Sequence, residues 1–460
     1  MLPYPVLLLA VVGASIASIG LLASAAGVRS RDPAVVLILI LTTYWTIVGA
    51  IPVILAKWQS PTDLYSYLET RLFRLRLDNA YGETLLMYSF FLVVVGLLVV
   101  TLTRRMDQPS EARYQERWTK LAYRFSHSLL LIVVFIILLL KLAIVLTLLR
   151  SSADSSIYIV TRIARGDLAP LIRIYQYLNI ASSYSLSGGL ALWLSFSEAR
   201  LSYARVYRRV VSLAYLGIAL LILAENAILG NRSVPLVMMG AVTAGWTRWR
   251  YLPAEAMVRR RLRHQFVAVG FTGFVLLGAI GISRGGSLST PTDVAASLVG
   301  NVSRVGNLVV QEVRSSEKVA AHMSLYGIVE RGSFVPDPAI RNSYGEYARI
   351  VNAPSDQVFT IHYVTSWWLR LGLAGVLVAT LTFALVVVGL QRLASGSASL
   401  RSAGVRLAAA TLPAAALPIT LIRGGPESLR AVAVEILFIP AAIITPCFVI
   451  GRHRPGPAES

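Results

Sequence analysis

Arginine side chains at the ends of apolar segments are the residues of this sequence whose type and placement best suit chemistry. Arg232 and Arg284 each stand at the end of a long apolar run, and Arg304 and Arg314 follow in the next polar stretch. A guanidinium group offers a planar fork of donors that captures phosphate oxygens two at a time. As a set, these arginines predict a site for the phosphate or pyrophosphate headgroup of a lipid. Taken singly, each one also suits plain contact with headgroups or water.

Several further charges lie inside or at the ends of apolar segments, where a charge costs about 2.5–3.5 kcal/mol even on lenient insertion scales. They are Lys141, Glu225, Arg232, Arg370 and Glu435. Each is therefore expected to face protein or water. For Lys141 and Glu435 the sequence leaves open an interhelical ion pair or a snorkelling side chain. Glu225 precedes Arg232 by about two helical turns, so these two side chains are candidates for a pair or for a shared substrate-binding role.

His362 is the histidine best placed for proton transfer. It precedes Trp367-Trp368 and Arg370, a pattern typical of a membrane interface. An imidazole with a pKa near neutrality could take a proton from a sugar hydroxyl. A structural, hydrogen-bonded histidine fits the same sequence equally well. We therefore treat His362 as a candidate base and Arg370 as a candidate substrate-binding residue.

The motifs of several enzyme classes are missing from the chain. It has no HExxH, no Walker A loop and no Gly-x-Ser-x-Gly in a strand-to-helix context. No Asp-x-Asp pair occurs in the segments assigned below to the outside, so nothing suggests a metal-bound nucleotide sugar. The single cysteine, Cys447, excludes an internal disulfide and a cysteine metal cluster. We predict neither a metal nor another cofactor.

The elements that must position these residues are membrane spans. Of 460 residues, 56% are hydrophobic and only 14% are charged, which is too apolar for a soluble domain of this size. The net charge of +20 does not indicate nucleic acid, because the arginines sit in short connections between apolar runs. We predict an all-α polytopic membrane protein with about eleven transmembrane helices. They are placed near residues 3–26, 34–56, 84–103, 128–149, 183–199, 210–229, 233–247, 266–283, 367–390, 404–422 and 431–450.

The basic residues of the connections orient these spans. The connections 104–127 and 248–265 carry dense clusters such as Arg259-Arg260-Arg261, so the positive-inside rule makes them cytoplasmic. We therefore predict a multi-pass protein of the cytoplasmic (inner) membrane whose site faces the extracytoplasmic side. Residues 3–26 end like a signal peptide, but their charge order favours a retained first helix. The extracytoplasmic connections are 57–83, 150–182, 230–232, 284–366 and 423–430.

Three regions follow from this topology: the first eight helices at 1–283, an extracytoplasmic loop at 284–366, and the last three helices with a cytoplasmic tail at 367–460. Within the loop, Thr290-Pro291 predicts a helix start. Apolar residues then recur every three or four positions, with Arg304 and Arg314 away from them, which predicts an amphipathic helix. We expect this loop to be ordered and packed over the outer mouth of the bundle.

One family resemblance emerges in the second half of the chain. The stretch ENAILGNRSVPLVMMGAVTAG, a basic connection and a span ending in ISRGG resemble the O-antigen polymerase family, the oligosaccharide repeat-unit polymerases. In that family an outer Gly-x-Arg-Ser opens a span, and a further arginine and a large outer loop follow. The next span is entered through a Gly-rich segment, here Leu371 to Gly375. The histidine before Tyr-x-x-Ser-Trp-Trp resembles the entry to that span in the related O-antigen ligases. The likeness covers roughly 220–390.

The resemblance implies a fold akin to the C-type glycosyltransferases and a lipid-linked glycan polymerase. A growing glycan on polyprenyl (undecaprenyl) pyrophosphate would be transferred to a new lipid-linked repeat unit, without a nucleotide sugar. Arg232 and Arg284 match the family's arginines and would hold the pyrophosphate. Arg304 is a further candidate, and His362 would be a base or a positioning group. The implied partners are the glycan donor and acceptor, membrane lipid and a chain-length regulator, with no nucleic acid.

Three other functions remain open at this stage. An O-antigen ligase differs from the polymerase only in its acceptor. A transporter or flippase of lipid-linked oligosaccharides usually shows two related halves with broken helices, and no such duplication is visible. A glycosyltransferase that uses a polyprenyl-phosphate sugar usually has a paired acid in a first large outer loop, whereas 57–83 offers only scattered acidic residues.

Overall fold

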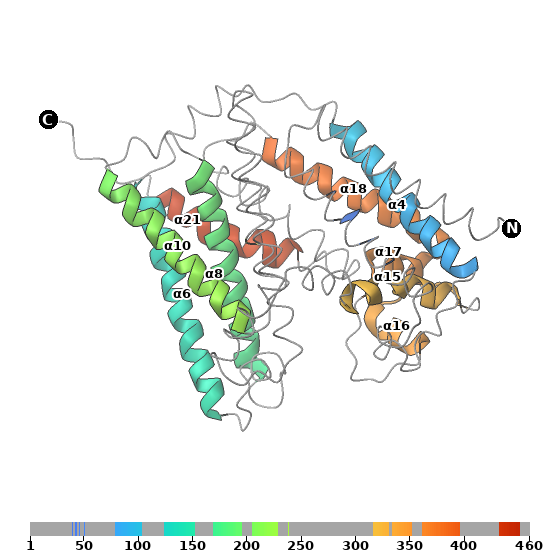
Figure 1. The fold of residues 1–460 in the computed structure, drawn as a ribbon, viewed down its shortest axis with the longest axis horizontal. Helices are drawn as coiled ribbons and strands as arrows, with labels where there is room; N and C mark the ends of the chain where they lie inside the picture. Colours follow the sequence, from blue (N-terminus) through green and yellow to red (C-terminus); the bar gives the residue numbers. More distant parts are fainter. Residues whose placement is uncertain are drawn as a thin grey trace, which may run out of the picture. The chain divides into compact units, whose positions relative to one another are not determined.

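The computed structural model describes eight continuous segments and a few single residues of the chain, and every regular element among them is helical. The segments are 79–103, 124–151, 169–195, 205–228, 316–330, 334–351, 361–395 and 432–450, and the single residues are Leu39, Thr42, Thr43, Thr46, Ala50 and Met238. No strand occurs within these residues. The expected all-α class is therefore confirmed for the described part of the chain (Figure 1).

The chain forms two compact units, each built from segments far apart in sequence. Unit 1 comprises Met1–Met106, Val310–Arg392 and Ala416–Val432. Unit 2 comprises Asp107–Val309, Leu393–Ala415 and Ala433–Ser460. The helices of unit 1 are α4 (Asn79–Thr103), α15 (Ser316–Val329), α16 (Ser343–Ile350), α17 (Tyr363–Leu371) and α18 (Leu373–Ser395). Those of unit 2 are α6 (Arg124–Ser151), α8 (Ala169–Ser195), α10 (Arg205–Ile228) and α21 (Ile439–Ile450), which follows the π-helical η3 (Val432–Phe438).

Three of these helices contain stretches long and apolar enough to cross a membrane: Ala80–Leu102, Ser126–Leu148 and Val206–Asn226. Large apolar side chains stand exposed on them, for example Leu142 on α6 and Leu213 on α10. Such outward faces suit contact with lipid. The helices indicate a membrane-associated protein and agree with three of the predicted spans, while the count of eleven and the orientation stay predictions.

Unit 2 is organised around α8, which packs against α6, α10 and α21. Helix α8 begins at Ala169, although the sequence analysis placed all of 150–182 in an extracytoplasmic connection. Residues 169–182 are therefore helical and continuous with the start of the span predicted at 183, while their side of the membrane stays a prediction. The early part of α8 carries Tyr175, Asn179 and Ser182, which lowered its hydropathy, but these side chains are buried inside the unit. Their polar atoms bond to neighbouring helices, so burial does not leave them unsatisfied.

Unit 1 packs three short helices beside the long helix α4. Figure 1 shows α15, α16 and α17 gathered together next to α4. Their apolar core consists of Ile328, Tyr347, Val351, Ile361 and Leu369. The described parts of the predicted outer loop, 316–330, 334–351 and 361–366, therefore pack together, whereas the amphipathic helix expected around Arg304 and Arg314 lies outside the described residues.

The span predicted at 367–390 is in fact two helices, α17 and α18, joined at Gly372. This glycine has a φ of 58°, a conformation that costs other residues energy because Cβ crowds the backbone. Its N–H donates to the Trp368 carbonyl at 2.8 Å and closes α17. The Asp337 N–H donates to the Leu369 carbonyl at 3.1 Å and holds the 334–342 segment against the break. The predicted span is thus interrupted at Gly372, and Arg370 stands on the short helix before the interruption.

Candidate functional site: a histidine network and a membrane ion pair

His362 caps the helix that carries Arg370. Its Nδ1 accepts a hydrogen bond from the Val364 N–H at 3.2 Å, which satisfies one of the free donors at the start of α17. Its own backbone N–H donates to Ser324 Oγ on α15 at 3.0 Å. The residue thereby fixes both the start of α17 and the docking of α15.

The other ring nitrogen of His362 is also engaged. Nε2 lies 3.2 Å from Thr46 Oγ1, and Thr46 Oγ1 donates to the Thr42 carbonyl at 2.8 Å. Because Nδ1 accepts, we assign the proton to Nε2, which donates to Thr46. The ring is fully buried between Tyr88, at 4.6 Å between centroids, and Phe91, at 6.0 Å.

This environment keeps His362 neutral. Burial, together with the neighbouring His322, lowers the pKa of His362 to about 3. The geometry is that of the structural histidine which the sequence left open beside the candidate base. A catalytic role for His362 stays a prediction, and the contacts seen favour positioning over direct proton transfer.

His322 on α15 is a second buried histidine, and the sequence analysis assigned it no role. Its Nδ1 lies 3.0 Å from the Thr46 carbonyl, so Nδ1 carries the proton, and Nε2 accepts from the Tyr81 hydroxyl at 3.1 Å. The Tyr88 hydroxyl donates to the His322 carbonyl at 3.0 Å. Burial lowers the pKa of His322 to about 4. No sequence signal marks these partners, because they lie 234 to 276 positions away.

Arg370 stands near the C-terminal end of α17, half-buried, with its guanidinium held by serine oxygens. Nη1 donates to Ser343 Oγ at 2.6 Å, to Ser366 Oγ at 2.9 Å and to the Ser366 carbonyl at 2.9 Å. Ser343 opens α16 and Ser366 lies one turn before Arg370 on α17. These three acceptors are neutral oxygens of α16 and α17, and they orient the guanidinium. Substrate binding by Arg370 is consistent with this placement and stays a prediction.

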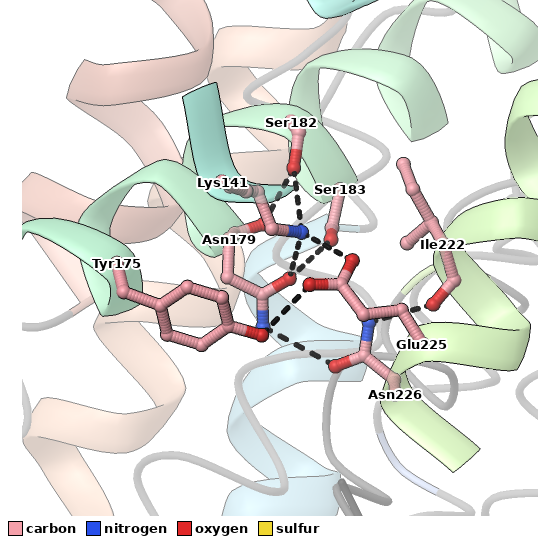
Figure 2. Close-up of polar contacts among 8 residues, drawn as sticks. All are labelled: Lys141, Tyr175, Asn179, Ser182, Ser183, Ile222, Glu225 and Asn226. Carbon is pink, nitrogen blue, oxygen red and sulfur yellow. Dashed lines mark hydrogen bonds and ion pairs between the residues drawn. The ribbon is translucent and has the colours of Figure 1, made fainter. Parts of the chain in front are cut away.

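In unit 2, Glu225 forms an ion pair with Lys141 at the meeting point of three helices. Lys141 Nζ on α6 lies 2.5 Å from Glu225 Oε2 on α10 (Figure 2). The Tyr175 hydroxyl on α8 donates to the other carboxylate oxygen, Oε1, at 2.7 Å. The interhelical ion pair is one of the two interpretations left open for Lys141, and the structure shows it. The predicted substrate-binding role of Glu225 is untested.

Amide and hydroxyl groups of α8 complete the surroundings of the lysine. Lys141 Nζ donates to Asn179 Oδ1 at 2.8 Å and lies 3.4 Å from Ser182 Oγ. It also stands 5.8 Å from the centre of the Tyr175 ring. Tyr175, Asn179 and Ser182 follow one another at helical spacing on one face of α8, which is why they meet one lysine. Asn179 Nδ2 then donates to Asn226 Oδ1 at 3.2 Å and links α8 to α10.

Arg232, Arg284, Arg304 and Arg314 all lie outside the described residues. Of the candidate site residues, His362 and Arg370 fall in unit 1 and Glu225 in unit 2. Comparison of the chain with protein-family models, with curated proteins and with solved structures returns no match.

Proposed function

We propose that this protein is a membrane glycosyltransferase that polymerises polyprenyl-pyrophosphate-linked oligosaccharide repeat units on the outer side of the cytoplasmic membrane. The observation that carries the proposal is the placement of Arg370. It stands at the head of a predicted span, on a short helix that His362 caps, and serine oxygens orient its guanidinium. A preorganised cation at the outer bilayer boundary is what capture of a lipid diphosphate requires.

The proposed reaction uses the bond between the sugar and the pyrophosphate of the donor lipid. An acceptor sugar hydroxyl attacks the anomeric carbon, the bond from that carbon to the pyrophosphate oxygen breaks, and the hydroxyl proton is released. Negative charge grows on the departing pyrophosphate, so cations beside it lower the barrier. In this scheme Arg232 and Arg284 hold the pyrophosphate, and Arg304, Arg314 and Arg370 contact the substrate. No nucleotide sugar is consumed.

His362 acts as a positioning group in this proposal. Both of its ring nitrogens already have partners, and the ring is buried away from any acceptor hydroxyl. By capping α17 it fixes the helix on which Arg370 stands, four residues after Ser366. Loss of the cap would loosen the placement of the guanidinium rather than remove a proton acceptor.

The test replaces Arg232 and Arg284 singly by alanine in cells that make the polysaccharide. Each variant is expected to abolish long-chain glycan while the protein remains in the membrane at normal levels. Arg349→Ala is the matched control, because Arg349 is an exposed arginine of α16 whose contact is an ion pair with Glu346. A glycan ladder of unchanged length in both variants would overturn the polymerase assignment.

A transporter or flippase of lipid-linked oligosaccharides is the second candidate, and the Lys141–Glu225 pair favours it. Ionisable residues inside membrane helices often mark transport pathways. An assay of the purified protein in detergent distinguishes the two functions, because micelles have no two compartments between which a transporter could move its substrate. A purified transferase still lengthens lipid-linked glycan there, whereas a transporter makes no product. An O-antigen ligase would instead attach the glycan to an acceptor other than a lipid-linked repeat unit.

A further inference from the structure

The proposed sugar transfer does not use the Lys141–Glu225 pair, so the presence of this pair needs a separate explanation. The pair lies inside a helical unit whose outer face is apolar: Leu139 and Leu142 on α6 and Leu220 on α10 are about half exposed, whereas Lys141 is buried. Two charges have therefore been placed where each costs about 2.5–3.5 kcal/mol even on the lenient scale.

Helix cohesion alone does not account for these charges. The Asn179–Asn226 hydrogen bond already links α8 to α10, and Leu148 packs on Ile172 between α6 and α8. Neutral polar side chains of this kind hold membrane helices together without burying charge. A buried ion pair can usually be replaced by apolar residues at no loss of stability, so its presence is weak evidence for a structural role.

The two partners differ in their access to the surroundings. The Lys141 side chain is 1% exposed and the Glu225 side chain is 26% exposed. Glu225 lies three residues before the end of α10 at Ile228, or about 5 Å along the axis, whereas Lys141 lies ten residues before the end of α6 at Ser151, about 15 Å away. The predicted topology puts both helix ends on the extracytoplasmic side. The carboxylate is thus the member of the pair that is open to its surroundings.

We propose that the Lys141–Glu225 pair is a proton-binding site inside the membrane, where Glu225 takes up a proton from the extracytoplasmic side and α10 then shifts relative to α6 and α8. In this step an O–H bond forms on one Glu225 carboxylate oxygen and nothing else is consumed. The carboxylic acid is neutral, so the ammonium of Lys141 loses its counter-charge in an apolar interior. Movement of α10 relieves that cost by admitting water or another anion.

The groups that face Glu225 fit this switch. Within the described part of unit 2, its charged or titratable contacts are Lys141 from α6 and Tyr175 from α8 (Figure 2). Glu435, on the η3 segment before α21, acts instead on Tyr184. Lys141 keeps Asn179 and Ser182 as neutral acceptors, but neither can replace a carboxylate. Protonation of one side chain therefore weakens the contacts of α10 with both of its neighbours.

Infrared difference spectroscopy of the protein in lipid nanodiscs tests proton uptake directly. Lowering the pH is expected to produce the carbonyl stretch of a newly protonated carboxylic acid, and Glu225→Gln should abolish that band. Glu435→Gln is the matched control, since it removes another carboxylate of the same unit and should leave the Glu225 band in place. A band that survives in Glu225→Gln, or that never forms in the unaltered protein, overturns the proposal.

Maleimide labelling of a buried cysteine tests the movement of α10. It is carried out in the otherwise unaltered protein and in a doubly neutral variant, so the test does not depend on a single-charge variant that could misfold. Ser183, fully buried on α8, is replaced by cysteine in a Cys447→Ala background. Because the reactive thiolate becomes scarcer as the pH falls, labelling is expressed relative to the same variant unfolded in denaturant at that pH, and this relative labelling is expected to rise several-fold as the pH falls. The doubly neutral variant Lys141→Met/Glu225→Met keeps no unpaired charge and should fold, and its labelling should be independent of pH. An equal rise in the double variant, or no rise in the parent, would refute the coupling. Neither readout depends on sugar transfer, so each stands whether or not the glycosyltransferase proposal does.

Discussion

Replacing His362 by asparagine or by alanine separates a capping histidine from a catalytic base. Asparagine is a strong N-cap residue whose side-chain oxygen can accept the Val364 N–H, whereas alanine cannot. Neither residue can act as a proton acceptor near neutral pH. If His362 positions α17, the asparagine variant keeps much of the activity and the alanine variant loses it. If His362 is a base, both variants fail alike.

The expected magnitudes follow from the contacts of the ring. Loss of the N-cap costs about 1 kcal/mol. Loss of the Nε2–Thr46 hydrogen bond costs about 1 kcal/mol, and the Thr46 hydroxyl keeps its bond to Thr42. The edge contacts with Tyr88 and Phe91 add roughly 0.5–1.5 kcal/mol each. Alanine should therefore destabilise unit 1 by about 3–5 kcal/mol, and asparagine by about 1 kcal/mol less, since it retains the cap.

Two measurements on the same preparations decide between the roles. Unfolding in mixed micelles gives the stability difference, and the rate of glycan elongation gives the activity. Removal of a general base typically slows a reaction by about 10²–10⁴-fold whatever the replacement. An asparagine variant that is folded and yet as inactive as the alanine variant would refute the positioning role. Arg349→Ala again serves as the control for unit 1.

Two further predictions concern packing and pH. Gly189→Ala should destabilise unit 2 by about 1–3 kcal/mol, because the new methyl group would overlap the Leu130 side chain. Gly217 has open space around it, so Gly217→Ala should change stability by less than about 1 kcal/mol in the same unfolding assay. Because burial lowers the pKa of His322 and His362 from 6.5 to about 4 and about 3, the unfolded chain binds more protons than the folded one between these values. The free energy of unfolding should thus be at its full value above pH 6.5 and should decline as the pH falls toward 4. The double variant His322→Gln/His362→Asn should show a flatter decline. An unfolding midpoint that does not change over this range would contradict the assignment.

Long, uniformly apolar helices are the part of the fold that the sequence predicted well. The spans placed at 84–103 and 128–149 fall within α4 and α6, and the span placed at 210–229 coincides with α10 as far as Ile228. Hydropathy succeeds there because each residue makes its own contribution to the transfer energy from water to lipid. The start of α8 was missed for the same reason, since Asn179 counts as polar in any hydropathy sum. Its partner Lys141 lies 38 positions away, and only the fold brings the two together.

The sequence identified candidate site residues from their type and position along the chain. It did not identify the residues they contact, and those contacts decide the role of each side chain. Lys141 and Glu225 were recognisable as costly charges, but their pairing across 84 positions was not. His362 was recognisable as a histidine before a span, yet its role depends on Thr46, 316 positions earlier. The break at Gly372 was hidden, because a glycine within an apolar run is compatible with a continuous membrane helix.

The two polar clusters differ in what protonation would do to them, and this difference bears on where chemistry can occur. Around His322 and His362 each of the four ring nitrogens has a partner and both rings are neutral, so a proton has no acceptor that is ready to receive it. The ion pair in unit 2 instead holds a carboxylate with partial access to its surroundings. Proton exchange therefore belongs to Glu225, whereas the histidines give unit 1 the fixed geometry that holds Arg370. In the two proposals, arginine stabilises charge on a substrate while a different group responds to pH, so variants at one site should leave the other function unaltered.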